Sequence, residues 1–280
     1  MTPEQYCEQK AAPRGSSLYY SLLFLPLERR QAITALRALQ RELRDAVEQA
    51  SDPGVARTRL LWWREELSAA LAGNPQHPVT KAVCRVLTRW ELPGEQLFEL
   101  LDGAQMDLDY NRYPDFATLE VHCSRMSGVV CLLSARVLGH EHPATREFAR
   151  TLGTALQLAT IIRDAGADAR RNRIYLPLED LHRFGLETDD IIALREDERF
   201  ERLMTFEIER AQNLFERVGS LLNREDRKAQ RAHLIMAALD GALLDEIARL
   251  RGHTLNQRVA LTPLRKLWIA WRTWVATSAK

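Results

Sequence analysis

The chain has 280 residues, of which 46% are hydrophobic, and it can therefore build a sizeable core as one large domain or two smaller ones. Lys and Arg number 39 against 38 Asp and Glu, so the net charge of +1 creates no global field that would draw the protein to nucleic acid. Any anion must be bound by local clusters of positive charge.

Four cysteines without a CxxC pair are too few for a disulfide framework at this length, and they indicate a reducing, cytoplasmic setting. The N-terminus lacks the basic-then-apolar order of a signal peptide. The longest nearly apolar run, Leu18 to Leu27, is well below the roughly 18 residues that span a bilayer. We therefore expect no membrane-spanning segment.

From Ser17 onward, apolar residues recur at intervals of three and four, and strand-like alternation is nearly absent. Residues 1–16 lie outside this pattern and could be disordered. We predict an all-α fold, with residues 1–280 as a single domain whose helices surround a central cavity. The expected helices are 17–24, 28–50, 54–72, 77–90, 94–109, 116–138, 143–168, 178–182, 188–194, 198–222, 228–250 and 262–276.

The stretch from Gln157 to Pro177 carries the clearest chemical signal. Asp164 and Asp168 are four residues apart, so on a helix both carboxylates lie on one face and could reach a common ligand. Gly166 leaves no bulk between them. Carboxylate oxygens suit Mg²⁺, and the arginines that follow suit a diphosphate. The alternative is a solvated helix end whose charges pair locally.

A cavity with carboxylates at one end and apolar walls along its depth would suit a substrate with a diphosphate head and a greasy tail. Other chemistries find no support in the sequence. The seven histidines are scattered, which argues against a zinc site, and GxSxG, GxGxxG and GxxxxGK[ST] motifs are absent.

Residues 157–177 resemble the second aspartate-rich motif of the squalene and phytoene synthase family, QLxNIxRDxxEDxxxxRIYLP. Residues 17–26 (SLYYSLLFLP) resemble the N-terminal segment of that family, and residues 106–109 (MDLD) resemble its mid-chain acidic segment. Residues 261–274 (LTPLRKLWIAWRTW) resemble the C-terminus of its hopanoid-associated branch, which makes presqualene diphosphate. The resemblance covers nearly the whole chain.

This resemblance implies an isoprenoid synthase fold and the head-to-head joining of two farnesyl diphosphates, as in presqualene diphosphate and squalene synthases. The implied cofactor is Mg²⁺, with NADPH only if the product is reduced to squalene. Asp164, Asp168 and Asp45 would hold metal and, with Glu48, form the catalytic set. The implied substrate-binding residues are Arg41, Arg44, Arg163, Arg173, Tyr20, Gln157 and Thr160. No oligomeric state follows.

The first aspartate-rich motif departs from the family pattern, which reads approximately YAFCREVDDVVD where this chain reads RALQRELRDAVE. Arg44 replaces the first motif aspartate, Glu48 the last, and Arg37 a tyrosine expected near the diphosphate. A unit charge interacts with another by roughly 4 kcal/mol at 4 Å and an effective dielectric of about 20, so an arginine here would abolish or weaken one metal site.

The alternative for this segment is a solvated helix face, because Arg41 with Asp45 and Arg44 with Glu48 have the i,i+4 spacing of ion pairs. Further departures favour a second hypothesis, a non-catalytic relative that binds prenyl lipids or serves in assembly. The departures are Thr160 for an asparagine, Cys131 for a glycine, Ser124 for an aromatic residue, and Asp240-Gly241 for a tyrosine-arginine pair.

The last expected helix carries Trp268, Trp271 and Trp274 among basic residues. Such a helix could seat the protein on an anionic membrane, which would make it peripheral to the inner membrane on the cytoplasmic side. We favour the alternative that this stripe packs on the domain.

Overall fold

The computed structural model describes residues 1–50 and 52–277. Helices account for 72% of the single-domain structure, which confirms the all-α prediction, and no strand occurs among the described residues. The elements are α1 (Pro3–Ala11), α2 (Ser17–Leu22), α3 (Leu27–Glu48), α4 (Pro53–Leu71), α5 (Pro78–Arg89), α6 (Gln96–Asp109), α7 (Phe116–Cys123), the π-helix η1 (Ser124–Gly128), α8 (Val129–Leu138), α9 (Ala144–Ala169), α10 (Leu178–Arg183), α11 (Thr188–Ile192), α12 (Glu198–Leu221), α13 (Arg231–Arg249) and α14 (Pro263–Ala276).

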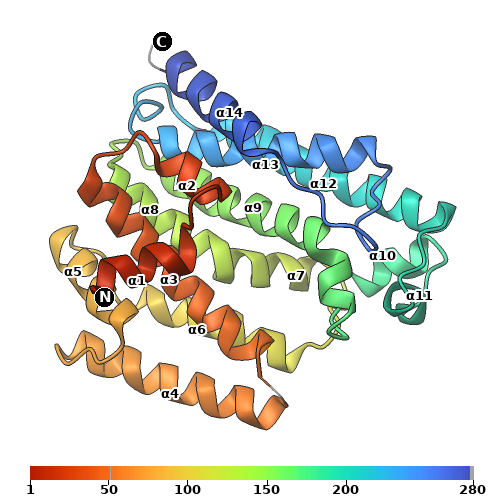
Figure 1. The fold of residues 1–280 in the computed structure, drawn as a ribbon, viewed down its shortest axis with the longest axis horizontal. Helices are drawn as coiled ribbons and strands as arrows, with labels where there is room; N and C mark the ends of the chain where they lie inside the picture. The colour runs from red at the N-terminus through yellow and green to blue at the C-terminus, as the bar shows by residue number, and fades with distance from the viewer. Residues whose placement is uncertain (51, 278–280) are drawn as a thin grey trace.

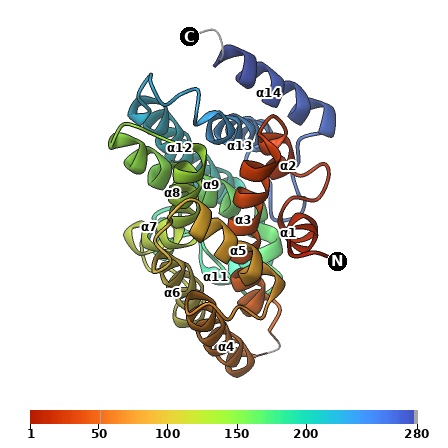
Figure 2. The same cartoon turned by 90° about the vertical axis from the view of Figure 1, so that its left-hand side faces the viewer.

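The expectation that the first 16 residues could be disordered is wrong, because α1 forms there. Thr2 and Gln5 make a reciprocal capping box, and Pro3 occupies the first turn, where its missing N–H costs nothing. Cys7 is buried in the main core. The helix lies against α3 and α5, as Figure 2 shows near the N-terminus.

The predicted helix 116–138 is continuous but changes geometry at its centre. Residues Ser124–Gly128 form the π-helix η1 between α7 and α8. A π-bulge widens the hydrogen-bond ladder, and such bulges are frequent at functional sites. By length and composition, Phe116–Leu138 is the one described helix that could span a membrane, and 78% of its most apolar window is buried inside the fold.

Helix α9 runs through the middle of the molecule (Figure 1) and contributes residues to both hydrophobic cores. Its first half contributes Leu152 and Leu156 to a cluster with α3, α5, α6 and α8. Its second half contributes Leu158 and Ile162 to a cluster with α12 and α13. Because α9 is packed on several sides, the end that carries Asp164 is rigidly placed.

Helix α14 lies on the outside of α13, at the edge of the molecule opposite α4 (Figures 1 and 2). Ile269 and Ala270 face inward, and Trp274 stacks on Phe24 with ring centroids 5.2 Å apart. Trp268 and Trp271 are 55% and 46% exposed. The prediction that the whole stripe packs on the domain is therefore wrong for these two tryptophans.

Candidate functional site

A cavity of about 480 Å³ opens between α3 and α9, and it is closed at its sides by α13, η1 and the segment after α1. Its lining residues are Lys10, Ala11, Pro13, Ser16, Ser17, Leu18, Arg37, Gln40, Arg41, Arg44, Ser127, Leu156, Gln157, Thr160, Arg163, Met236, Asp240 and Arg258.

The chemical character of this cavity differs from the prediction. Five arginines and one lysine line it, and Asp240 is the only carboxyl among its described lining residues, whereas carboxylates and long apolar walls were expected. Gln40, Ser127 and Gln157 add polar groups along its depth. A cavity of this composition favours an anionic ligand.

The carboxylates on α3 are already neutralised by neighbouring cations. Asp45 is bridged by Lys10 Nζ at 2.8 Å and by Arg41 Nε at 3.0 Å. Glu48 forms a close ion pair with Arg44 and a second one with Arg171 Nη1 at 3.2 Å. The i,i+4 pairs inferred from the sequence do form, but their acids are largely buried, with the side chains of Asp45 and Glu48 10% and 4% exposed.

The two acids on α9 differ in their surroundings. Asp164 is gripped by the guanidinium of Arg163, with Nε at 2.8 Å from Oδ1, and Arg258 Nε lies 3.4 Å from the same oxygen. Asp168 is buried, and burial raises its pKa to about 7 although Arg44 opposes the shift. At neutral pH, Asp168 is therefore poised between its protonated and ionised forms.

Gly166 has a structural role that the sequence did not reveal. A Cβ atom built at this position would lie 2.1 Å from the carbonyl oxygen of Leu255, so only glycine lets the backbone after α13 approach α9. Arg170 Nη2 donates to that same oxygen at 2.9 Å. This close approach fixes the segment that carries Arg258 beside Asp164.

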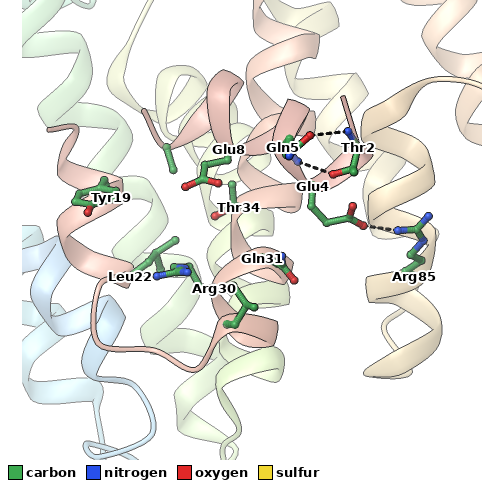
Figure 3. Close-up of a pocket in the computed structure, with 12 residues that line it drawn as sticks. Thr2, Glu4, Gln5, Glu8, Tyr19, Leu22, Arg30, Gln31, Thr34 and Arg85 are labelled. Atoms are coloured by element: carbon green, nitrogen blue, oxygen red, sulfur yellow. Dashed lines mark hydrogen bonds and ion pairs between the residues drawn. The ribbon is translucent and has the colours of Figure 1, made fainter. Parts of the chain in front are cut away.

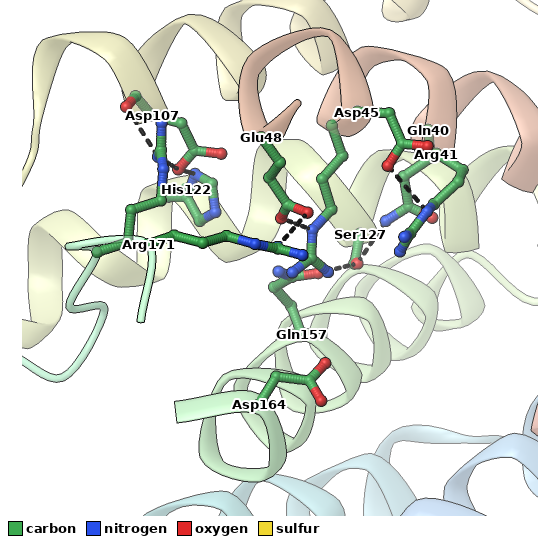
Figure 4. A network of polar contacts seen from close by, with 12 residues as sticks. Gln40, Arg41, Asp45, Glu48, Asp107, His122, Ser127, Gln157, Asp164 and Arg171 are labelled. Atoms are coloured by element: carbon green, nitrogen blue, oxygen red, sulfur yellow. Dashed lines mark hydrogen bonds and ion pairs between the residues drawn. The ribbon is translucent and has the colours of Figure 1, made fainter. Parts of the chain in front are cut away.

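A chain of hydrogen bonds ties α3 to α9 through η1 (Figure 4). Gln40 Nε2 donates to the Met126 carbonyl at 2.9 Å and to Ser127 Oγ at 2.8 Å. Ser127 Oγ in turn donates to Gln157 Oε1 at 2.8 Å. The network holds the two walls of the cavity in register.

Arg37 and Asp240 form a polar wall deeper in the cavity. Arg37 donates to Gln40 Oε1 at 3.0 Å and to Cys131 Sγ at 3.2 Å, while its Nε is buried without a partner. Burial raises the pKa of Asp240 to about 6, and the positive charges of Arg163 and Arg37 oppose the shift.

The structure brings some of the predicted site residues into the cavity and leaves others out. Tyr20 packs edge-on against Tyr19, with ring centroids 5.3 Å apart, and lies outside the lining. Arg173 donates to the Asp107 carbonyl at 2.9 Å and supports a buried cluster behind the cavity. The predicted residues that line the cavity are Arg41, Arg44, Arg163, Gln157 and Thr160.

Lys10 is a lining residue that the sequence reasoning missed. The signal was present, because the sequence Thr2-Pro3-Glu4-Gln5 has the form of a capping box with proline at the first helical position. Recognition of this helix start would have predicted α1, and with it a cation that could approach the acids of α3.

A second cavity, of about 410 Å³, lies between α1, α2 and α3 near the N-terminus (Figure 3). Glu4 and Arg85 form an ion pair across it. It is separate from the acids of α9 and from the polar network. We therefore assign the functional site to the cavity between α3 and α9.

An all-α bundle around a cation-lined cavity, with two aspartates four residues apart on a central helix, defines a protein of the isoprenoid synthase class. Residues 11–265 match the family model for squalene/phytoene synthase. The chain therefore belongs to the squalene/phytoene synthase family, whose enzymes are head-to-head prenyltransferases.

Named relatives support this assignment over most of the chain. It is 33% identical to phytoene synthase of Arthrospira platensis, covering 94% of this chain and 89% of that protein. It is 32% identical to presqualene diphosphate synthase of Rhodopseudomonas palustris, covering 84% of each.

Solved structures share the fold. The squalene synthase HpnC from Alicyclobacillus acidocaldarius superimposes with a TM-score of 0.75 at 26% identity, over 89% of this chain and 94% of that chain. A dehydrosqualene synthase in complex with a ligand superimposes with a TM-score of 0.83 at 24% identity, over 99% of this chain and 97% of that chain, which is a likeness of fold.

Prenyl transfer in this family depends on a divalent metal, and the donor set here fits that requirement on one wall only. No three acidic, histidine or cysteine side chains of the described residues converge as metal ligands. On α3, Arg44 stands where a ligand was expected, and Asp45 is held by two cations. On α9, Asp168 forms no ion pair with the described residues, and Asp164 could join it in holding one ion only by loosening its contacts with Arg163 and Arg258. Substrate phosphates and water would complete the shell of that ion.

Proposed function

We propose that this chain acts on farnesyl diphosphate, binding its diphosphate in the cavity between α3 and α9 and joining two such molecules head to head. The observation that carries the proposal is the cluster of six cations on that cavity, beside the helix end with Asp164 and Asp168, in a fold of the squalene/phytoene synthase family. The similarity to a presqualene diphosphate synthase supports the choice of a 15-carbon substrate.

In this proposal Arg41, Arg44 and Arg163 grip the diphosphate. Asp164 and Asp168 would hold a single Mg²⁺, which when bound would help to stabilise the departing diphosphate. Asp45 is paired with Arg41, and Glu48 is paired with Arg44. We therefore assign these two acids to positioning the arginines and not to metal binding. NADPH would be needed only if the product is reduced to squalene.

A second candidate function is a non-catalytic protein that binds prenyl diphosphates. The specific observation that favours it is the neutralised set of acids on α3, which leaves that wall without a free metal ligand. Both candidates require binding of a prenyl diphosphate, and they differ only in turnover.

Turnover separates the two candidates. The purified protein is incubated with Mg²⁺ and prenyl diphosphates of 15 or 20 carbons, with and without NADPH, and diphosphate release and hydrocarbon products are followed. The enzyme proposal expects diphosphate release and a 30-carbon product from the 15-carbon substrate. Binding of a farnesyl diphosphate analogue without any turnover would select the non-catalytic function.

We also propose that α14 rests on an anionic lipid surface, at the cytoplasmic face of the inner membrane. The apolar side chains exposed on α14 recur at helical spacing and so form one stripe, and Arg272 is exposed nearby. Interfacial tryptophans beside a cation suit the boundary of a bilayer, where prenyl products collect. The stripe consists of Leu264, Leu267, Trp268, Trp271 and Val275.

A further inference from the structure

We infer that Arg44 and Arg37 bind the diphosphate directly, so that the cavity holds a prenyl diphosphate without a metal ion on the α3 wall. The inference deepens the proposed function and rests on it. In this inference the guanidinium groups of Arg44 and Arg37 neutralise the diphosphate charge, as metal ions on this wall would otherwise do.

Arg44 is held through Nε of its guanidinium group, and the residue lines the cavity. Its Nε is tied to Glu48, and Glu48 is itself held by Arg171 Nη1 at 3.2 Å. Among the described residues, Nη1 and Nη2 of Arg44 have no hydrogen-bond partner, and Arg44 lines the cavity. A guanidinium held in this way has lost its conformational freedom before the ligand arrives, which favours tight binding.

Arg37 is a half-buried cation that has no carboxylate partner among the described residues. No carboxylate of the described residues lies within ion-pair distance of it, and its neighbours are the Cys131 and Met236 sulfur atoms and the Gln40 amide. Its Nε is buried with no acceptor. Asp240 lies on the same wall but forms no ion pair with Arg37, so an anion in the cavity would give Arg37 a directly bonded counter-charge.

The charges on the α3 wall oppose the binding of a divalent metal ion there before the diphosphate binds. A divalent ion placed beside Arg44 would meet a fixed positive charge where a carboxylate was expected, and Asp45 would have to give up Lys10 and Arg41. A diphosphate meets no such obstacle. Its oxygens match the planar forks of arginine, which bind phosphate in bidentate fashion.

The test is isothermal titration of the full chain with inorganic pyrophosphate and with farnesyl thiodiphosphate, in EDTA and in Mg²⁺. We expect both ligands to bind in EDTA, and we expect Mg²⁺ to strengthen binding only by the contribution of the ion on Asp164 and Asp168. Arg44→Gln and Arg37→Gln should each weaken binding in EDTA by about tenfold or more, because each removes a charge-assisted hydrogen bond. Arg29→Gln, an exposed change on the same helix, is the matched control and should bind as the parent does.

Arg44→Asp provides the opposite change, since it supplies the carboxylate that the family motif has at this position. Its binding of pyrophosphate should become dependent on Mg²⁺, with a difference of about tenfold or more between Mg²⁺ and EDTA. Circular dichroism and the melting temperature establish that each variant is folded. If Arg44→Gln does not fold, Arg44→Lys, which keeps the charge but lacks the fork, takes its place.

The outcomes separate this inference from the proposed function. Binding of farnesyl thiodiphosphate by the parent protein only when Mg²⁺ is present overturns the inference and leaves the proposed function standing. Metal-independent binding that survives both glutamine changes overturns the assignment to Arg44 and Arg37. Absence of binding under every condition overturns the proposed function itself.

Discussion

At the scale of single residues, Arg44 decides what the α3 wall can do. The sequence alone indicated that an arginine at this position would weaken a metal site, and it also allowed a solvated ion pair with Glu48. The structure shows that the pair forms and that it is buried, with the Arg44 side chain 16% exposed. What the sequence could not supply was Arg171, which lies 123 residues away and meets Glu48 only in the fold.

Asp240 gives a prediction for the pH dependence of stability. Its pKa is about 6 in the folded protein against an ordinary value of 3.8, so its contribution to stability is fully present below pH 3.8 and is lost as the pH rises through 6. The free energy of unfolding of Asp240→Asn, relative to that of the parent, should therefore rise by up to about 3 kcal/mol from pH 4 to pH 8. Urea denaturation at both pH values measures this difference. Identical slopes with pH in the two proteins would contradict the assignment.

Gly166 gives a prediction for packing. Gly166→Ala would push a methyl group into the Leu255 backbone and should lower the free energy of unfolding by about 2 kcal/mol or more. The matched control is Gly219→Ala on α12, where nothing lies within 4 Å of the new atom and a gain of about 0.5–1 kcal/mol is expected. Equal effects at the two glycines in denaturant titrations would rule out the close approach.

At the scale of helices, apolar periodicity together with the Pro and Gly breaks predicted most elements to within a few residues. The exceptions have local causes. Helix α1 is short and polar, so its start signal at Thr2 carries more information than its hydrophobic pattern. The π-helix η1 has no signature in apolar spacing and is seen only in the backbone of Ser124–Gly128, where Gln40 Nε2 donates to the Met126 carbonyl.

Helix α14 gives a prediction for membrane contact. Replacement of Trp268 and Trp271 together by serine should reduce binding to anionic liposomes by about tenfold or more, because both rings lose their interfacial burial. Trp62→Ser is the control, since Trp62 is 45% exposed on α4 at the opposite edge of the molecule. Sedimentation with liposomes measures the effect. Unchanged sedimentation of the double variant would exclude α14 as the lipid contact.

At the scale of the whole molecule, a net charge of +1 conceals a strong local asymmetry. Six cations and one carboxyl line a single cavity, and the acids that balance them lie behind the lining, paired with these cations or buried. The sequence predicted that an anion site must be local, and the family motifs placed it near Asp164. The composition of the cavity could not be predicted, because Lys10, Arg37 and Arg258 come from three distant segments that the fold brings together.

The family fold and the altered first motif together indicate that arginines hold the diphosphate of a prenyl ligand between α3 and α9. A crystal structure of the complex with farnesyl thiodiphosphate, grown in EDTA, tests it most directly. We predict that oxygens of the diphosphate lie within hydrogen-bonding distance of the Arg44 and Arg37 guanidinium groups. A diphosphate found elsewhere on the protein, with both arginines unchanged in their contacts, would contradict the account.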